Sequence, residues 1–556
     1  MRNANVNVRL RRRSALLCAL LAMAVLVPLP AGAQQGPPDR VDPPAPWEGP
    51  YPEDPSEPPL EGLRAFTAQP SARYTASGQR FAAHSINELS GSNRFSTSVA
   101  VSRAGWPDGS AAAILATGEH HADALASAGL AGTVDAPLLL TPTTRLEGAV
   151  ADELKRLRPQ RVYVVGLLTG DVERAVADLG LETERIGGSD VYATAVALAK
   201  RAIELGADGS TVLIASGGSF ADALSASALA AGRKLPILLA PASNAAWLGD
   251  RIAEIAPERI WVVGGSGAVS EEVLAELPPY VRLAGSERTA TALEVANRAR
   301  ANGLTGPPVL ASAESFPDGL SGGVFAGLKR SAPVLLTYRA QLSEGPARYL
   351  AAHGTGRIDV TGGSAAIAPL TRCQVKAGDT RALVCVEEEL HRQGYNVGPV
   401  DGRLDHLSVW SFYAFQKVAG IRPTGSFGEA EFRRLAENPR LRPRHPELGP
   451  NHVEIDIARQ LVLVVRDGEV RHVLHTSTGK ASTPTIRGRF TVYETRNYRQ
   501  RHNAMYRPSF FIRGYAFHGY PSVPLYPASH GCARLYDGDM DFLWRFVQRG
   551  TRVASY

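Results

Sequence analysis

Towards the C-terminus, a cysteine and two histidines are spaced in a way that suits nucleophilic catalysis. Cys532 follows Ser529-His530-Gly531, and His518 stands 14 residues upstream of it. A cysteine nucleophile needs a thiolate, a base that accepts the thiol proton and donors that stabilise an oxyanion. His518 can be the base. Gly531 allows a sharp backbone turn, so we expect the amides of Gly531 and Cys532 to point at the oxyanion.

Arg534, two residues beyond the cysteine, adds a fixed positive charge to this group. A neighbouring guanidinium can lower the pKa of a thiol or hold a substrate carboxylate. We therefore expect these surroundings to favour the thiolate form of Cys532.

Three other roles are open to the same residues. Cys532 can be a buried free cysteine, and the two histidines can be core residues with satisfied hydrogen bonds. His518, His530 and Cys532 can also bind zinc together, although they lack the usual spacing of zinc ligands.

The pattern resembles the signature of the L,D-transpeptidase catalytic domain. That signature, H-x(n)-S-H-G-C-x-R, runs here from His518 to Arg534, within residues 450–556. The resemblance implies that Cys532 is the nucleophile and His518 the general base, which the carbonyl of Gly519 orients. The other residues that it implies are His530, Gly531 and Arg534 in the catalytic pocket, and Ser529, Gly519 and Tyr520 at the substrate.

The resemblance also implies acyl transfer in two steps, without a metal or an organic cofactor. Cys532 expels D-Ala from a stem tetrapeptide and forms a thioester, which an amine of a neighbouring stem resolves into a 3-3 cross-link. With water as acceptor the enzyme would be an L,D-carboxypeptidase. A non-catalytic adhesion protein of the cell surface is the alternative outside enzymes. The stretch from His518 to Ser529 is short for the family, which implies an unusual substrate lid.

The domain that positions these residues is expected to be mainly β. Residues 452–477 alternate apolar and polar side chains, and Asp467-Gly468 is a hairpin turn signal between two strands. Residues 488–496 and 510–519 are predicted to form further strands, which puts His518 at the end of an apolar strand.

Before this domain, a unit of 97 residues occurs three times. Its opening motif, LSGSNRFST in the first copy, begins at Leu89, Ile186 and Leu283. A second motif, ADAL or PDGL, follows at Ala122, Ala221 and Pro317. Landmarks that recur in one order at one period indicate internal repetition.

Each repeat alternates apolar runs with a helix of small residues. In the second copy, residues 211–218 and 235–241 are continuous apolar runs on either side of the predicted helix 221–232. Such strands are typical of a parallel sheet that helices cover on both faces. We therefore predict a small doubly wound α/β domain for each repeat. The glycines at 264–267 do not form a dinucleotide fingerprint, so we interpret them as a strand-to-helix turn.

These units resemble the type 2 cell-wall-binding repeat of Gram-positive surface proteins. The matching residues are the G-S-x-R-x-x-T opening (91–97), PLLLTP (137–142), DALSAS (222–227) and VVGGSGAVS (262–270). The second copy departs from the pattern, with Val191 where the others have Arg94 and Arg288. The resemblance implies a pseudo-threefold unit that attaches non-covalently to an anionic cell-wall polymer.

Residues 373–440 are expected to form a small α-helical domain. An amphipathic segment at 382–396 precedes two further helical segments, 407–421 and 424–435. The pattern resembles the three-helix peptidoglycan-binding domain at 394–395, 400–402, 415–416 and 420–421. A helical spacer with inward-facing aromatic side chains is the alternative.

The N-terminus predicts export. Residues 1–33 hold five arginines, an apolar core shorter than the roughly 20 residues of a membrane span, and Ala31-Gly32-Ala33 before Gln34. A secreted, wall-associated protein without a transmembrane span after cleavage follows from this. Cleavage removes Cys18, and disulfides are favoured outside the cell. Cys373 and Cys385 are then expected to pair, which leaves Cys532 as a reactive thiol.

Charge is divided unevenly along the chain. Residues 451–556 hold 15 Lys and Arg against 8 Asp and Glu, whereas residues 34–450 carry a net charge of −6. A basic domain suits nucleic acid, but export makes nucleic acid a poor partner. We expect a monomer that binds peptidoglycan stem peptides and an anionic wall polymer.

The predicted fold is therefore multidomain: three α/β repeats, a small helical domain and a mainly-β catalytic domain. Its predicted parts are a signal peptide (1–33), a Pro-rich linker (34–84), three repeats (85–181, 182–279 and 280–372), a helical domain (373–440) and a catalytic domain (450–556).

Overall fold

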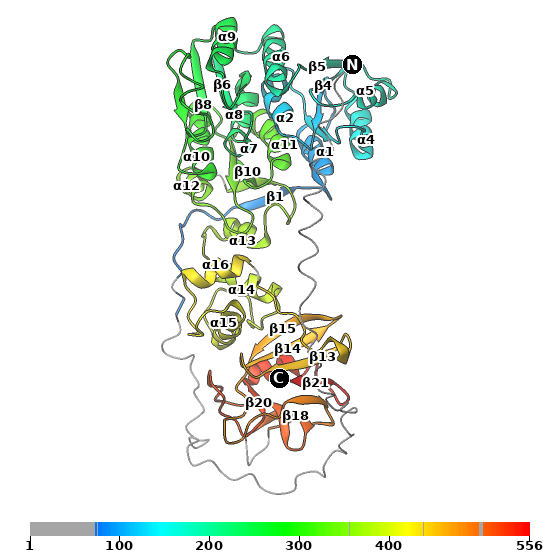
Figure 1. Cartoon of the computed structure of the whole chain (residues 1–556), viewed down its shortest axis with the longest axis vertical. Helices are drawn as coiled ribbons and strands as arrows, with labels where there is room; N and C mark the ends of the chain where they lie inside the picture. The colour runs from blue at the N-terminus through cyan, green and yellow to red at the C-terminus, as the bar shows by residue number, and fades with distance from the viewer. Residues whose placement is uncertain (1–72, 75, 355, 438, 500–503) are drawn as a thin grey trace, which may run out of the picture. The chain divides into compact units, whose positions relative to one another are not determined.

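The computed structural model describes residues 73–74, 76–354, 356–437, 439–499 and 504–556 (Figure 1). The predicted signal peptide and the linker residues up to 72 lie outside the described residues. Within these ranges, no helix has both the length and the hydrophobicity that crossing a membrane requires.

The three repeats contain three parallel four-stranded sheets, which confirms the predicted α/β fold. Their strands, in spatial order, are β3 (Leu138–Thr141), β2 (Ala112–Thr117), β4 (Arg161–Val165) and β5 (Thr183–Ile186); β7 (Ile237–Ala240), β6 (Thr211–Ser216), β8 (Arg259–Val263) and β9 (Val281–Leu283); and β11 (Val334–Thr337), β10 (Val309–Ser312), β12 (Arg357–Thr361) and β1 (Ser85–Leu89). Every residue of β2 and β6 is buried. Burial on both faces explains why these strands are continuous apolar runs in the sequence.

One edge strand of each sheet comes from a different repeat. β5 belongs to the start of the second repeat but pairs with β4 of the first, and β9 of the third repeat pairs with β8 of the second. β1 of the first repeat pairs in parallel with β12 of the third, from Ser85 opposite Arg357 to Leu89 opposite Thr361. The sheets are therefore offset by one strand from the sequence repeats, and the exchange closes them into one pseudo-threefold body.

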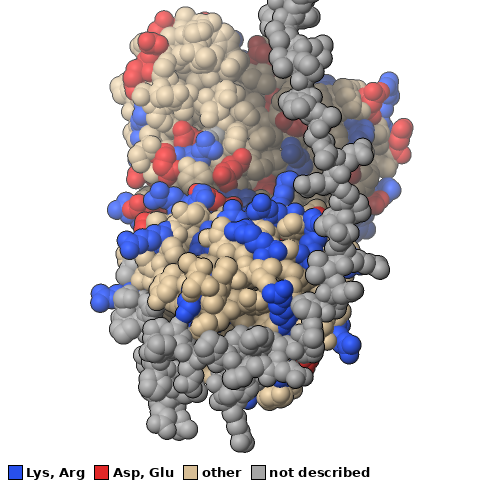
Figure 2. All heavy atoms as spheres, turned by 60° about the horizontal axis from the view of Figure 1, so that its bottom comes forward, with Lys and Arg blue, Asp and Glu red and all other residues tan. Residues whose placement is uncertain are grey.

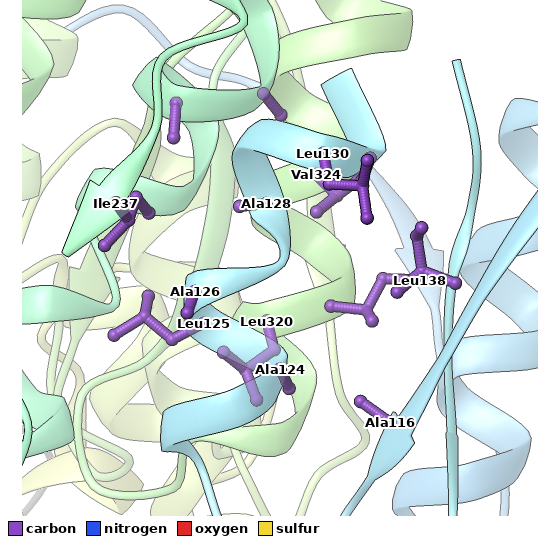
Figure 3. Close-up of a cluster of buried hydrophobic side chains, with 14 of the residues drawn as sticks. Ala116, Ala124, Leu125, Ala126, Ala128, Leu130, Leu138, Ile237, Leu320 and Val324 are labelled. Atoms are coloured by element: carbon purple, nitrogen blue, oxygen red, sulfur yellow. The ribbon is translucent and has the colours of Figure 1, made fainter. Parts of the chain in front are cut away.

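Helices of small residues pack closely where the repeats meet. The helices of the repeats are α1 (Arg94–Gly105), α2 (Ala122–Ala126), α3 (Ala128–Thr133), α4 (Gly148–Leu157), α5 (Gly170–Ala177), α6 (Val191–Glu204), α7 (Phe220–Ala223), α8 (Ala226–Arg233), α9 (Ala245–Ile255), α10 (Arg288–Ala301), α11 (Pro317–Phe325), the π-helix η2 (Ala326–Arg330) and α12 (Glu344–His353). A Cβ atom at Gly132 would collide with the Ala231 carbonyl, and one at Gly323 with Ser227. Apolar side chains from all three repeats, among them Leu125, Ile237 and Leu320, fill this region (Figure 3).

The helix α13 (Pro369–Ala377) spans the predicted boundary between the third repeat and the helical domain, and α14 (Leu383–Arg392), α15 (His406–Ala419) and α16 (Glu429–Glu437) follow within that domain. The expected disulfide between Cys373 and Cys385 is confirmed, and it joins α13 to α14. Tyr74 and Phe81, in the stretch predicted as the end of the linker, contact this segment. The Tyr74 hydroxyl donates to the Arg381 carbonyl (2.6 Å), and the Phe81 amide donates to the Gly378 carbonyl (2.8 Å).

The C-terminal domain is mainly β, as predicted, and consists of two sheets and a short helix. In spatial order the sheets are β15 (Glu469–His475), β14 (Leu461–Arg466), β13 (His452–Asp456), β21 (Arg552–Ser555) and β16 (Gly488–Thr491); and β17 (Glu494–Thr495), β18 (Tyr506–Ile512), β19 (Tyr515–Gly519) and β20 (Ala533–Leu535). The helix α17 (Asp537–Leu543) and the short 3-10 helix η3 (Pro446–Leu448) complete it. Asp467 and Gly468 both have positive φ in the β14–β15 hairpin, which confirms that turn.

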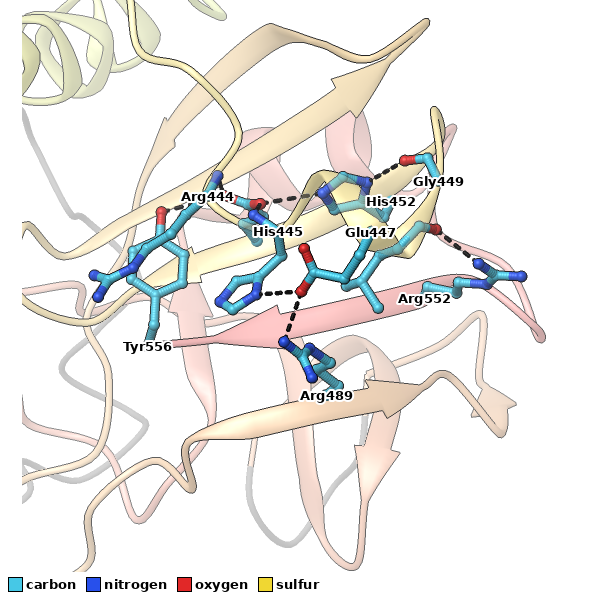
Figure 4. Close-up of polar contacts among 10 residues, drawn as sticks. Arg444, His445, Glu447, Gly449, His452, Arg489, Arg552 and Tyr556 are labelled. Carbon is cyan, nitrogen blue, oxygen red and sulfur yellow. Dashed lines mark hydrogen bonds and ion pairs between the residues drawn. The ribbon is translucent and has the colours of Figure 1, made fainter. Parts of the chain in front are cut away.

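The buried carboxylate of Glu454 fixes the segment that enters this domain, and Figure 4 labels its partners Arg444, His445 and Tyr556. It accepts hydrogen bonds from the backbone amides of Arg444 (3.0 Å) and His445 (2.6 Å) and from the Tyr556 hydroxyl (3.2 Å). Nε2 of His452 lies 3.1 Å from the same carboxylate. One side chain of β13 thus holds both the entry segment and Tyr556.

The helical segment and the C-terminal sheet share one hydrophobic core. Leu461, Leu463 and Val473 of the sheet pack in the same cluster as Leu390 and Phe415 of the helices. The helices α14 and α15 are therefore packed against the C-terminal sheet.

Candidate catalytic site

The pairing of β19 with β20 places the predicted base beside the predicted nucleophile. The two strands are parallel, with Phe517 opposite Ala533 and His518 opposite Arg534. Side chains alternate between the faces of a strand. His518 and Arg534 therefore lie on one face of the sheet, and the turn that carries Cys532 directly precedes β20. The charge of Arg534 affects the pKa of both His518 and Cys532, so Arg534 lies near the predicted base and near the predicted nucleophile.

His518 is buried and held in one tautomer. Its side chain is 3% exposed, and its Nδ1 lies 3.0 Å from the Gly519 carbonyl oxygen. Because a carbonyl can only accept, Nδ1 carries the proton and Nε2 has the free lone pair. Burial, together with the charges of Arg534 and Arg499, lowers the pKa of His518 to about 3. At neutral pH the imidazole is uncharged and ready to accept a proton, and the orienting contact expected from Gly519 is present.

Cys532 is half-buried, and its thiol is protonated at neutral pH. Its Sγ lies 3.7 Å from the Gly514 carbonyl oxygen. Burial raises the pKa of the Cys532 thiol to about 11, and the opposing effects of the Ala516 backbone and of Arg534 are smaller. The expectation that these surroundings favour the thiolate is therefore wrong, because desolvation outweighs the nearby positive charge.

A tight turn presents the cysteine, and Ser529 stabilises it. The Ser529 hydroxyl donates to the Cys532 carbonyl (2.7 Å) and accepts from the Gly531 amide (3.1 Å). Gly531 has φ +115°, and a Cβ atom there would collide with the ring of Tyr515. Because the Gly531 amide is bonded to Ser529, the expectation that it points at an oxyanion is wrong.

Three threonines that no sequence pattern singles out donate hydrogen bonds to backbone carbonyls of this turn and of β20. The Thr485 hydroxyl donates to the Gly531 carbonyl (2.8 Å), and the Thr483 hydroxyl donates to the Ser529 carbonyl (3.1 Å). The Thr476 hydroxyl donates to the Arg534 carbonyl (2.7 Å). Isolated threonines in a loop carry no spacing signal, so these contacts become visible only with the tertiary fold.

Arg534 and Tyr520 pack against each other beside His518. The guanidinium carbon of Arg534 lies 4.5 Å from the centre of the Tyr520 ring, a cation–π contact between two buried side chains. The Tyr520 ring also meets that of His518 edge to face, 5.9 Å between ring centres. His530 lies half-buried in the turn. His518, Tyr520 and Arg534 therefore form one contiguous group.

The loop between β19 and the cysteine turn is anchored to the helical segment. Val523 is 2% exposed and packs with Trp410 and Tyr413 of α15. Tyr526, in the same loop, is 66% exposed. In this loop, which is the predicted substrate lid, the part around Val523 is therefore held by packing, and the part around Tyr526 is open to solvent.

Comparison with family models finds two families along the chain. The cell wall binding domain 2 matches residues 88–171, 185–274 and 282–371. The L,D-transpeptidase catalytic domain matches residues 450–554.

Individual relatives match parts of the chain. N-acetylmuramoyl-L-alanine amidase LytC of Bacillus subtilis is 28% identical over 300 residues, which are 53% of this chain and 58% of LytC. The amidase enhancer of the same organism is 24% identical over 231 residues, 40% of this chain and 31% of that protein. The chain therefore matches less than two thirds of the length of either relative.

Solved structures are similar to different parts of the chain. Cwp6 from Clostridium difficile matches with a TM-score of 0.49 at 24% identity. The matched region covers 57% of this chain and 50% of the Cwp6 chain. An L,D-transpeptidase from Xylanimonas cellulosilytica matches with a TM-score of 0.29 at 33% identity. The matched region covers 32% of this chain and 93% of that transpeptidase.

Proposed function

Because this chain carries three cell wall binding domains of type 2 and an L,D-transpeptidase catalytic domain, we propose that it is an exported, wall-bound enzyme that cross-links peptidoglycan through a thioester on Cys532. The observation that carries the proposal is the arrangement of His518. Its Nδ1 is bonded to Gly519 and its Nε2 lone pair is free to act, on the strand next to the cysteine turn.

Acylation begins when Sγ of Cys532 attacks the carbonyl carbon of the stem peptide bond. The thiol proton passes to Nε2 of His518 as the carbon–sulfur bond forms. The carbon–nitrogen bond then breaks, and His518 returns this proton to the amine of the departing D-Ala. A thioester and a neutral imidazole remain.

In deacylation an incoming amine is the nucleophile and the sulfur of Cys532 is the leaving group. The amine of a second stem peptide attacks the thioester carbonyl and gives up a proton to Nε2 of His518. As the new peptide bond forms, the sulfur leaves and recovers the proton from His518. No metal or organic cofactor takes part in either step.

The repeats supply attachment in this proposal. They hold the enzyme non-covalently on an anionic polymer of the cell wall, and the C-terminal domain acts on the stem peptides within reach. The protein works as a secreted monomer at the cell surface.

The product masses formed from purified disaccharide-tetrapeptides test this function. The mature chain should form a cross-linked dimer with loss of one D-Ala, and treatment with a chelator should leave the yield unchanged. His518→Ala should lose most turnover while remaining folded by circular dichroism. Tripeptide without dimer would identify a carboxypeptidase instead. Unaltered substrate, with the protein folded, would contradict both enzymatic functions.

A further inference from the structure

A basic groove of about 570 Å³ lies in the C-terminal domain, and none of the residues that line it belongs to the catalytic site. Its walls come from residues 448–451, from Arg466 at the end of β14, and from residues 545–546 and 548–552. Four of its lining residues are arginines, and none is acidic. These arginines are Arg466, Arg545, Arg549 and Arg552.

Backbone carbonyls hold two of these arginines in place. Nη2 of Arg466 donates to the Phe546 carbonyl (3.1 Å), and its guanidinium carbon lies 5.3 Å from the centre of the Phe546 ring. Nη1 of Arg552 donates to the Leu448 carbonyl (2.9 Å; Figure 4). Contacts with neutral carbonyls fix the position of a guanidinium without neutralising its charge.

The charge of the groove is not balanced within the described part of the chain. No Asp or Glu there forms an ion pair with any of the four arginines, whereas Arg489, Arg499 and Arg507 of the same domain each pair with a carboxylate. Figure 2, in which the C-terminal domain comes forward, shows Lys and Arg spread over its visible surface and few Asp or Glu. Like charges around one concave surface repel each other, and a bound anion relieves this repulsion.

The chemistry of the groove selects the class of ligand. Guanidinium groups form paired hydrogen bonds with carboxylate and phosphate oxygens, and several of them along a groove suit a chain of regularly spaced anions. We propose that this groove binds an acidic polymer of the cell wall, whose charges are phosphodiesters or carboxylates. It gives the C-terminal domain a wall contact of its own, separate from the repeats and from the stem-peptide site.

Binding by the full mature chain, measured by titration calorimetry with two probes, tests this inference. Poly(glycerol phosphate) supplies phosphodiesters and poly-glutamate supplies carboxylates. The test variant is Arg545→Gln with Arg549→Gln, since both side chains are exposed in the groove. The matched control is Arg471→Gln with Arg487→Gln, which removes the same charge from the same domain outside the groove.

The groove variant should lose about tenfold in affinity for at least one probe. The slope of log K against log salt should become shallower by about two. The control should bind nearly as the parent does, and turnover of soluble muropeptides should stay unchanged in both variants. The probe that shows the loss identifies the anion.

Equal losses in the two variants would overturn the inference, because net charge alone would then explain binding. Unchanged binding in the groove variant would overturn it as well, since the polymer would then be held elsewhere. Neither result bears on the Cys532 chemistry, which the muropeptide assay measures separately.

Discussion

The proton between Cys532 and His518 stays on sulfur at neutral pH. Burial raises the pKa of the thiol to about 11 and lowers the pKa of the imidazole to about 3. The thiolate–imidazolium pair is therefore strongly disfavoured in the free enzyme. Proton transfer must accompany attack on the substrate, so exact placement of the base matters more here than a preformed thiolate.

The reactivity of Cys532 towards iodoacetamide should report this pKa. Because the folded thiol has a pKa of about 11, the alkylation rate should rise about tenfold per pH unit from pH 7 to near 10. Mass spectrometry of the Cys532 peptide measures the rate, with the Cys532→Ala protein as background control. A rate that is already level at pH 7 would show a preformed thiolate and contradict this account.

Gly531 should tolerate no side chain. Its φ of +115° and the ring of Tyr515 leave no room for a Cβ atom, so Gly531→Ala should disrupt the cysteine turn and abolish turnover. Gly550→Ala is the matched control, because Gly550 has φ +93° in the same domain but open space around it. It should destabilise the domain by only about 1 kcal/mol. Thermal unfolding and muropeptide turnover measure both effects, and similar losses in the two variants would refute the steric argument.

The helix α15 is linked to the loop between β19 and the cysteine turn, residues 520–529, by packing and by hydrogen bonds. Nζ of Lys417 donates to the Gln460 carbonyl (2.9 Å) and lies 2.6 Å from Nδ1 of His475. Nε2 of His475 lies 3.3 Å from the Val523 carbonyl oxygen. Since Lys417 is the donor to Nδ1, His475 carries its proton on Nε2 and donates it to Val523. Hydrogen bonds thus connect the helix to the loop through the sheet.

Replacing Trp410 by alanine should make this loop more mobile. The indole is buried and stacks on His475, with ring centres 5.3 Å apart. We expect Trp410→Ala to destabilise the local packing by about 3–5 kcal/mol and to speed amide exchange in residues 520–529. Phe412→Ala is the control, since Phe412 is fully buried on the same helix but packs against Phe427. It should speed exchange in the helices and leave residues 520–529 protected.

Exchange measured by mass spectrometry distinguishes the two variants. Equal protection of residues 520–529 in Trp410→Ala and in the parent protein would contradict the coupling between α15 and the loop.

The sequence predicts the elements better than the contacts between them. Alternation and the Asp467-Gly468 signal give the β14–β15 hairpin, and the repeat period gives the three sheets. The period cannot show that β1 pairs with β12, because strand partners are chosen in space. The direction of the shift in the pKa of Cys532 is also wrongly predicted from the sequence, because it too depends on the tertiary fold. Arg534 is visible in the sequence, whereas the burial that outweighs it is a property of the tertiary fold.

At the scale of the whole molecule, chain segments far apart in sequence are tied together. β1 completes the third sheet, and Tyr74 stacks on Phe427 of the helical segment. The disulfide between Cys373 and Cys385 covalently links α13 to α14, at the junction of the repeats and the helices. These ties join the repeats to the segment that packs on the C-terminal sheet.

Thiol counting tests this junction. The mature chain, unfolded without reductant, should show one free thiol, because Cys373 and Cys385 are paired and Cys532 is free. Closing a loop of 12 residues should stabilise the protein by at most about 3 kcal/mol. Three free thiols would exclude the disulfide, and removal of Cys373 by Cys373→Ser should lower the melting temperature without affecting the alkylation of Cys532.

The measurement that tests the central claim most directly is the mass of the acyl-enzyme. A carbapenem presents a strained carbonyl that a nucleophilic cysteine with a histidine base should attack, so the protein should gain the mass of one drug molecule, located on the Cys532 peptide. Cys532→Ala should show neither the adduct nor cross-linked muropeptides, and Cys532→Ser should be nearly inactive because an alcohol is a weaker nucleophile. Adding His518→Ala to Cys532→Ala should reduce activity little further. Cross-linking by the Cys532→Ala protein at the parent rate would contradict the account and leave attachment to the wall as the function of this chain.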